Sequence, residues 1–174
     1  MKKKVFVLGG CRSGKSGHAL ETARKFSSGN KIFIATCIPY DDEMRHRVAR
    51  HQQERSGLWV TMEAPIHLPE AVIEADRKAD VVVVDCLTLW ISNLLVENPN
   101  TDQILKQFRC LTDAVSAATN PIILVSNEVG AGIVPENKLA RQFRDLVGWA
   151  NQAVAECVDQ VVWTVAGIPV TIKG

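Results

Sequence analysis

The residues best suited to phosphate chemistry form the segment Gly9-Gly10-Cys11-Arg12-Ser13-Gly14-Lys15-Ser16, close to the start of the chain. This Gly-x-x-x-x-Gly-Lys-Ser pattern follows an apolar run and precedes a helical pattern, which is the context that a phosphate-binding loop requires. Glycines let the backbone wrap closely around phosphates, and successive N–H groups with a helix N-terminus present partial positive charge. Lys15 is expected to reach the β- and γ-phosphates, and the Ser16 hydroxyl to bind Mg²⁺. The segment therefore predicts a nucleoside triphosphate site.

Asp85 offers a second oxygen ligand for the metal ion, because it directly follows the apolar run Val81–Val84. Open α/β sheets bind ligands outside the carboxyl ends of their strands, and a carboxylate at such an end suits Mg²⁺. An aspartate just before a helix that starts near Leu87 can equally serve as the helix N-cap. The two roles are compatible, and the residues alone leave both open.

A helical pattern over 41–56, with Asp41 or Asp42 as its N-cap, carries an unusual charged face. Four residues at four-residue spacing share that face: Glu43, Arg47, His51 and Arg55. Two arginines around a histidine form a basic strip for phosphates, and they keep the imidazole neutral, which is its nucleophilic form. The same spacing also fits a solvated charged face with an incidental histidine, so the residues alone do not decide its role.

Short apolar runs alternate with longer amphipathic patterns, as in a parallel sheet covered by helices on both faces. The runs predict strands at Val5–Leu8, Lys31–Ile34, Val81–Val84 and Pro121–Val125. Helices are predicted over 15–27, 41–56, 66–78, 87–96, 101–118 and 136–157. The segments Gln160–Val165 and Pro169–Ile172 predict a terminal hairpin that turns at Ala166-Gly167. The expected fold is a single P-loop (RecA-like) α/β domain over residues 1–174, with a mostly parallel, doubly wound sheet and a C-terminal hairpin.

Composition excludes several other classes of protein. The 174 residues have a formal net charge of +1, which is too small to attract nucleic acid or an acidic membrane surface electrostatically. No stretch approaches the roughly 20 apolar residues that span a bilayer. The five cysteines are odd in number and form no Cys-x-x-Cys pair, which favours reduced thiols in a cytoplasm over disulfides or a zinc site.

Three motifs in sequence order resemble the bifunctional adenosylcobinamide kinase/adenosylcobinamide-phosphate guanylyltransferase family of cobalamin biosynthesis. They are the phosphate loop, Asp42-Glu-Met-x-x-Arg47-x-x-x-His51-x-x-x-Arg55, and Asn127-Glu-Val-Gly-x-Gly-Ile-Val-Pro-Glu-Asn137, the last continued by Leu139-Ala-Arg141-x-Phe-Arg144-Asp145. The resemblance runs from Val5 to Ile172. It implies phosphorylation of adenosylcobinamide by ATP or GTP. It also implies transfer of GMP from GTP onto the product through a histidine–GMP intermediate.

The resemblance also implies roles for individual residues. The family's nucleophile falls on His51, and Arg50 stands where some members carry a second histidine. Nucleotide contacts carry over to Gly9 through Ser16, Ala35, Thr36, Cys37, Gln52, Gln53, Glu54, Arg55, Glu63 and Asp85, with Lys15 as a catalytic residue and Mg²⁺ at Ser16 and Asp85. The resemblance further suggests a homotrimer, with the helix over 136–157 as a candidate for the contact between subunits. Burial within its own domain explains that helix's apolar pattern equally well.

Some alternatives stay open at this point. Asn127 and Glu128 follow the predicted strand Pro121–Val125, and we hypothesise that they hold the corrinoid tail or the metal ion; a structural turn capped by Glu128 is the other interpretation. A single-activity guanylyltransferase or small-molecule kinase would share most of the motifs. A nucleotide-binding switch without covalent chemistry would share the phosphate loop.

Overall fold

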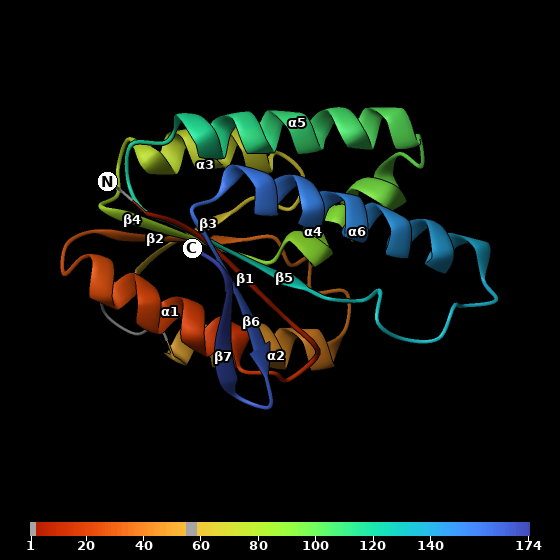
Figure 1. Cartoon of the computed structure of the whole chain (residues 1–174), viewed down its shortest axis with the longest axis horizontal. Helices are drawn as coiled ribbons and strands as arrows, with labels where there is room; N and C mark the ends of the chain where they lie inside the picture. The colour runs from red at the N-terminus through yellow and green to blue at the C-terminus, as the bar shows by residue number, and fades with distance from the viewer. Residues whose placement is uncertain (1–2, 55–58) are drawn as a thin grey trace.

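The computed structural model describes residues 3–54 and 59–174, apart from the side chains of Arg47 and of residues 50–54. The elements are, in chain order, β1 (Lys4–Gly9), α1 (Lys15–Phe26), β2 (Lys31–Ala35), α2 (Asp42–Glu54), β3 (Trp59–Glu63), α3 (Leu68–Asp76), β4 (Val81–Asp85), α4 (Leu87–Glu97), α5 (Thr101–Ala117), β5 (Ile122–Asn127), α6 (Lys138–Cys157), β6 (Gln160–Val165) and β7 (Ile168–Lys173) (Figure 1).

The strands form one seven-stranded sheet in the order β3-β2-β4-β5-β1-β6-β7. The pairings are parallel except that between β6 and β7, which is antiparallel. The central strands are buried on both faces, which is why Val81–Val84 reads as a continuous apolar run. The mostly parallel, doubly wound sheet and the C-terminal hairpin are therefore confirmed.

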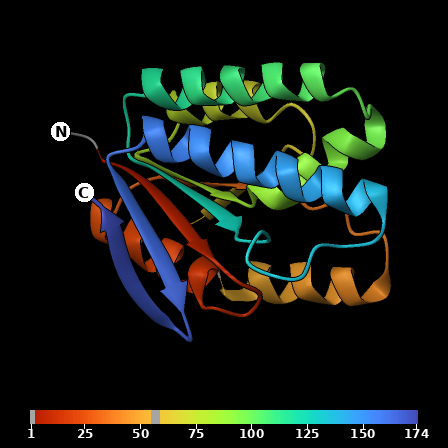
Figure 2. The same ribbon diagram turned by 45° about the vertical axis from the view of Figure 1, so that its right-hand side comes forward.

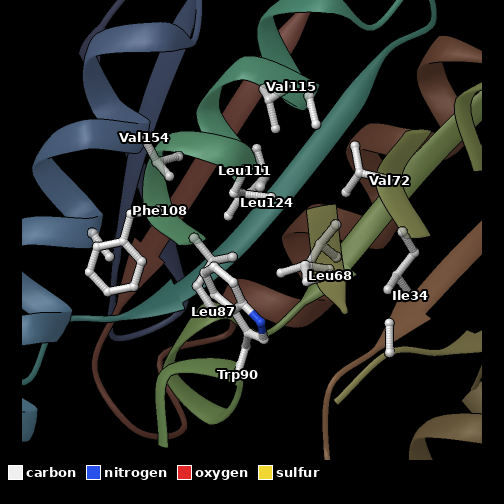
Figure 3. Close-up of a cluster of buried hydrophobic side chains, with 14 of the residues drawn as sticks. Ile34, Leu68, Val72, Leu87, Trp90, Phe108, Leu111, Val115, Leu124 and Val154 are labelled. Atoms are coloured by element: carbon white, nitrogen blue, oxygen red, sulfur yellow. The ribbon is translucent and has the colours of Figure 1, made fainter. Parts of the chain in front are cut away.

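Helices cover both faces of this sheet. Helices α1 and α2 lie on one side, and α3, α4, α5 and α6 lie on the other, as two views of the ribbon show (Figures 1 and 2). Side chains of β1 alternate between the two faces of the sheet. Val5 and Val7 belong to the hydrophobic cluster under α1, and Phe6 belongs to the larger hydrophobic cluster on the other face. In that cluster Trp90 is fully buried (Figure 3), and its Nε1 donates a 2.8 Å hydrogen bond to the Ile66 carbonyl.

The sequence prediction was incomplete at β3, which it did not include. Among the described strands, β3 (Trp59–Glu63) pairs with β2 alone and is the edge of the sheet. Its side chains are partly or well exposed, so it lacks the continuous apolar run that marks the buried strands. An edge strand with one covered face carries a much weaker signal than a central parallel strand.

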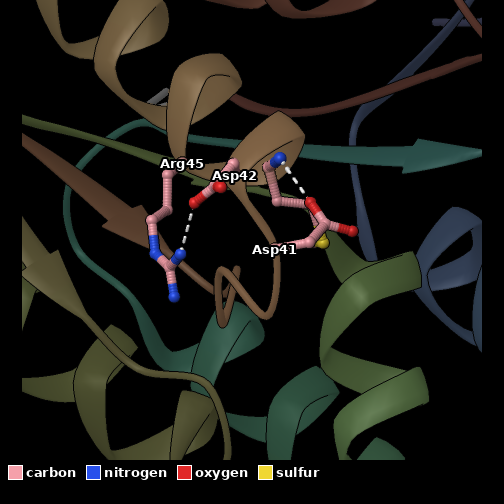
Figure 4. A network of polar contacts seen from close by, with 4 residues as sticks. Asp41, Asp42 and Arg45 are labelled. Atoms are coloured by element: carbon pink, nitrogen blue, oxygen red, sulfur yellow. Dashed lines mark hydrogen bonds and ion pairs between the residues drawn. The ribbon is translucent and has the colours of Figure 1, made fainter.

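The start of α2 is fixed by aspartates, as the sequence suggested. The Asp41 carboxylate accepts a 2.7 Å hydrogen bond from the Met44 backbone N–H, so Asp41 is the capping residue. Asp42 and Glu43 occupy the first turn, where negative charge is favourable, and Asp42 pairs with Arg45 at 2.6 Å (Figure 4). The helix observed is Asp42–Glu54, against the predicted range 41–56.

Over the part of the chain that the structure describes, no helix combines the length and apolar character needed to cross a membrane.

Candidate nucleotide site

The segment Gly9–Ser16 forms the connection between β1 and α1, with its glycines where backbone geometry requires them. Gly14 has φ +91° at the N-cap of α1, a left-handed conformation that a side chain would strain. An added Cβ at Gly9 would lie 2.2 Å from Thr164 Oγ1 and 2.3 Å from Ser13 Oγ, so only glycine fits there. Lys15 lies over the loop and donates a 3.0 Å hydrogen bond from Nζ to the Gly10 carbonyl. The arrangement is that of a phosphate-binding loop at a helix N-terminus.

The ends of the parallel strands bring several predicted residues to the same edge of the sheet. Ala35 at the end of β2 pairs with both Glu63 and Asp85, while Gly9 at the end of β1 pairs with Asn127. The strand order places β5 between the phosphate loop and Asp85, and places Glu63 four strands from Gly9. At about 4.8 Å per strand, Glu63 is roughly 19 Å across the sheet from the loop. A ligand that contacts both must therefore extend along the strand ends.

Asp85 and Ser16 offer the donor set that Mg²⁺ prefers, a carboxylate and a hydroxyl oxygen. Ser16 lies in the first turn of α1, and Asp85 is half-buried at the end of β4. Among the described residues, none donates a hydrogen bond to the Asp85 carboxylate, which leaves its oxygens available. Cys86 occupies the N-cap position of α4 without a side-chain cap, so the alternative of Asp85 as that cap is wrong. These residues fit a magnesium ion that keeps water and phosphate among its ligands.

Buried hydrogen bonds of Thr36 join the segment after β2 to the segment after β4 and to α4. Thr36 is fully buried, and its hydroxyl donates to the Cys86 carbonyl at 2.7 Å and accepts from the Cys86 N–H at 2.9 Å. Buried Asn93 of α4 donates to the Thr36 carbonyl at 2.8 Å. Because the Thr36 hydroxyl is occupied in both directions, Thr36 shapes the site around Asp85 through the backbone. Sequence reasoning did not identify Asn93.

Two cysteines close to Asp85 remain neutral thiols at physiological pH. Burial, followed by the negative charge of Asp85, raises the pKa of Cys86 to about 12. Burial also raises the pKa of Cys37, with Asp85 and Asp41 adding to the effect. Because the thiolate is the nucleophilic form, neither thiol is a good candidate nucleophile at this edge. Cys11 of the phosphate loop is exposed and free.

The predicted histidine face lies on α2, and among its members the structure describes the side chain of Glu43 but not those of residues 47, 51 and 55. His51 is located in the last part of Asp42–Glu54, and helical spacing puts it on one face with Glu43 and position 47. The side chains of Gln52, Gln53 and Glu54 are not described, and Arg55 lies outside the described residues altogether. The structure thus places the backbone of His51 on a helix and leaves its contacts as a prediction.

The segment after β5 is held by hydrogen bonds within the fold. Glu128 accepts a 2.6 Å hydrogen bond from the Gly130 N–H, which supports the interpretation of Glu128 as a turn cap. The Asn127 carbonyl accepts from buried Asn151 of α6 at 3.2 Å, and Arg144 donates to the Gly130 carbonyl. Helix α6 thereby fixes the chain directly beside the phosphate loop.

Fold and loop together define a P-loop nucleotide-binding protein of the RecA-like class. The structure is similar to that of the RadB recombinase, with a TM-score of 0.52, 13% sequence identity, and coverage of 92% of this chain and 73% of that one. The model of the family described as cobinamide kinase / cobinamide phosphate guanyltransferase matches residues 5–172. The chain belongs to this family of transferases.

Two relatives with assigned names align with nearly the whole chain. The bifunctional adenosylcobalamin biosynthesis protein CobP of Pseudomonas aeruginosa is 39% identical over 170 residues, covering 97% of this chain and 96% of that protein. The bifunctional adenosylcobalamin biosynthesis protein CobU of Escherichia coli K12 is 38% identical over 181 residues, covering 97% and 99%. The resemblance drawn from three sequence motifs is therefore confirmed at the level of the family.

Proposed function

We propose that this chain, as a single domain, carries out two successive transfers on a corrinoid. The first phosphorylates adenosylcobinamide with ATP or GTP. The second transfers GMP from GTP to adenosylcobinamide phosphate, giving adenosylcobinamide-GDP and pyrophosphate. The observation that carries the proposal is the phosphate loop, built with Lys15 over it and Asp85 on the same strand edge, in a member of this family.

In the first transfer, the loop holds the nucleotide so that its γ-phosphorus faces the aminopropanol hydroxyl of the corrinoid. The hydroxyl oxygen forms the new bond to phosphorus, the bond to the bridging β-oxygen breaks, and the hydroxyl proton is lost. Lys15 and the backbone N–H groups of the loop stabilise the charge that develops on the phosphates. Mg²⁺ held by Ser16 and Asp85 would neutralise further phosphate charge.

In the second transfer, the neutral imidazole of His51 attacks the α-phosphorus of GTP. A nitrogen–phosphorus bond forms, the bond from the α-phosphorus to the β-phosphate oxygen breaks, and pyrophosphate leaves, held by Lys15 and the loop. A phosphate oxygen of adenosylcobinamide phosphate then attacks the same phosphorus, releasing His51. Covalent catalysis separates one difficult transfer between anions into two steps.

Turnover by the wild-type enzyme tests the two-reaction proposal. With adenosylcobinamide and ATP, we expect ADP and adenosylcobinamide phosphate; addition of GTP should then release pyrophosphate and form adenosylcobinamide-GDP. Formation of only one product would identify a single-activity kinase or guanylyltransferase. Nucleotide binding without either product would identify a switch and contradict the proposal.

We further propose that the chain forms a homotrimer through its terminal hairpin. Paired positions place apolar side chains on one face of β6 and β7, and these are exposed: Trp163, Val165, Ile168 and Val170. On α6, the alternative contact, Leu146, Val147 and Ala150 are buried in the chain's own core and Phe143 packs against it. Leu139 and Trp149 are the large apolar side chains that α6 exposes, and they are not paired across strands as those of the hairpin are. The five free thiols suit a reducing compartment such as the cytoplasm.

Sedimentation equilibrium checks the assembly. We expect three times the chain mass of 19.1 kDa for the wild type. The Ile168→Asp variant, with a charge on the exposed apolar face, should sediment at a lower mass. A wild-type monomer would contradict the trimer, and an Ile168→Asp trimer would place the interface elsewhere.

A further inference from the structure

The terminal hairpin contacts the phosphate loop through a buried threonine. Thr164 of β6 pairs in register with Gly9, and only 2% of its surface is exposed. Its hydroxyl donates to the Leu8 carbonyl at 3.0 Å and lies 2.8 Å from Ser13 Oγ. Because the single hydroxyl proton of Thr164 is used by Leu8, Ser13 must be the donor in the second contact. The Ser13 side chain is thus held inside the fold, on the side away from solvent.

The turn of the hairpin contacts the same part of the loop through its backbone. Ala166 and Gly167 both have positive φ, at 51° and 83°, as a tight turn between twisted strands requires. The Gly167 N–H donates to the Ser13 carbonyl at 3.1 Å. An added Cβ at Gly14 would lie 3.3 Å from the Gly167 Cα, so loop and turn are in close contact.

These contacts set the orientation of one peptide group in the loop. In a trans peptide, the C=O and the following N–H point in opposite directions. Since the Ser13 carbonyl is directed toward Gly167, the Gly14 N–H is directed away from the hairpin. That N–H is one of the donors a phosphate needs at a helix N-terminus.

We propose that Thr164 and the Ala166–Gly167 turn position the phosphate loop for nucleotide, so that the terminal hairpin acts as a brace for the loop without touching the substrate. Thr164 is a positioning residue for both reactions, because both use the same loop. This inference rests on the proposed function of the loop. Strands β6 and β7, which belong to neither the phosphate-loop motif nor the histidine motif, thereby support nucleotide binding.

The test compares Thr164→Val, which keeps the shape and removes the hydroxyl, with Thr164→Ser, which restores the hydroxyl. We expect Thr164→Val to raise KM for MgATP in the kinase step and for MgGTP in guanylyl transfer by about tenfold, which is what loss of one or two buried hydrogen bonds predicts. Thr164→Ser should return both KM values to within about twofold of wild type. Thr171→Val, on exposed β7, is the matched control and should change neither.

A second arm separates positioning from general damage to the fold. Ser13→Ala removes the other end of the contact, so it should raise the nucleotide KM by a similar factor, and Thr164→Val should add little to it. The increase in Tm on adding MgGTP, measured from each variant's own nucleotide-free Tm, should shrink in both variants.

The outcomes separate the inference from the function on which it rests. Lys15→Ala is included as the reference variant, since it removes the loop's own cation. If Lys15→Ala loses nucleotide affinity while Thr164→Val and Ser13→Ala keep wild-type KM values, the brace is contradicted and the proposed function stands. If Lys15→Ala binds nucleotide as tightly as wild type, the proposed function of the loop fails first.

Discussion

Replacing His51 with alanine should abolish guanylyl transfer while leaving the kinase step measurable. The imidazole is the proposed nucleophile, and the thiols of Cys37 and Cys86 on the strand edge do not replace it, because burial raises the pKa of each and keeps it neutral. Removal of a covalent nucleophile costs at least about 10³-fold in rate. The kinase step has no covalent intermediate, and its phosphate loop, between β1 and α1, lies outside α2.

The measurement is turnover of adenosylcobinamide with ATP, and of adenosylcobinamide phosphate with GTP, by wild type and His51→Ala. His46→Ala is the matched control, because His46 is exposed, lies on the same helix and is turned to another face of it. The control should retain both activities. Equal loss of both activities in His51→Ala would show that His51 binds nucleotide or supports structure and is not the nucleophile.

Replacing Lys15 with alanine should lower both activities together, each by about 10²–10³-fold. Its ammonium is the cation over the loop, where it donates a 3.0 Å hydrogen bond to the Gly10 carbonyl. Loss of one group that stabilises developing charge has effects of about this size. In the proposed kinase step Lys15 would stabilise the transferred group, and in the proposed guanylyl transfer it would stabilise the departing pyrophosphate.

Lys25→Ala serves as the control for Lys15→Ala. Lys25 lies at the far end of the same helix α1, where it pairs with exposed Glu21 at 2.7 Å. Exposed pairs of this kind contribute little, so both activities should be unchanged. Retention of guanylyl transfer by Lys15→Ala would mean that the two reactions use separate phosphate sites.

Most of the fold could be predicted because buried parallel strands have continuous apolar runs and tight turns have characteristic residues. The runs at Val81–Val84 and Val5–Leu8 identified central strands, and Ala166-Gly167 identified the hairpin turn. Strand β3 was omitted because an edge strand with exposed side chains lacks that run. Local pattern therefore predicts the sheet's centre better than its edges.

The phosphate loop could also be predicted, because its chemistry depends on residues that are adjacent in sequence. The contacts that support it could not be, since they join segments far apart in the chain. Thr164 reaches Ser13 across 151 positions. On the strand edge around Asp85, Thr36 likewise reaches Cys86 across 50 positions. Threonine in a strand carries no local sign of such a partner. The strand order β5-β1-β6, which local sequence does not give, places the hairpin beside the loop.

We propose that one phosphate loop serves two reactions and that His51 receives the nucleotide in the second. Incubation with GTP labelled at the α- or the γ-phosphate tests this claim directly, followed by a chase with adenosylcobinamide phosphate. We predict an acid-labile, base-stable label on the protein from α-labelled GTP only, absent in His51→Ala and moved to adenosylcobinamide-GDP by the chase. A label that persists in His51→Ala, or wild-type product formed without any labelled protein, would contradict the account.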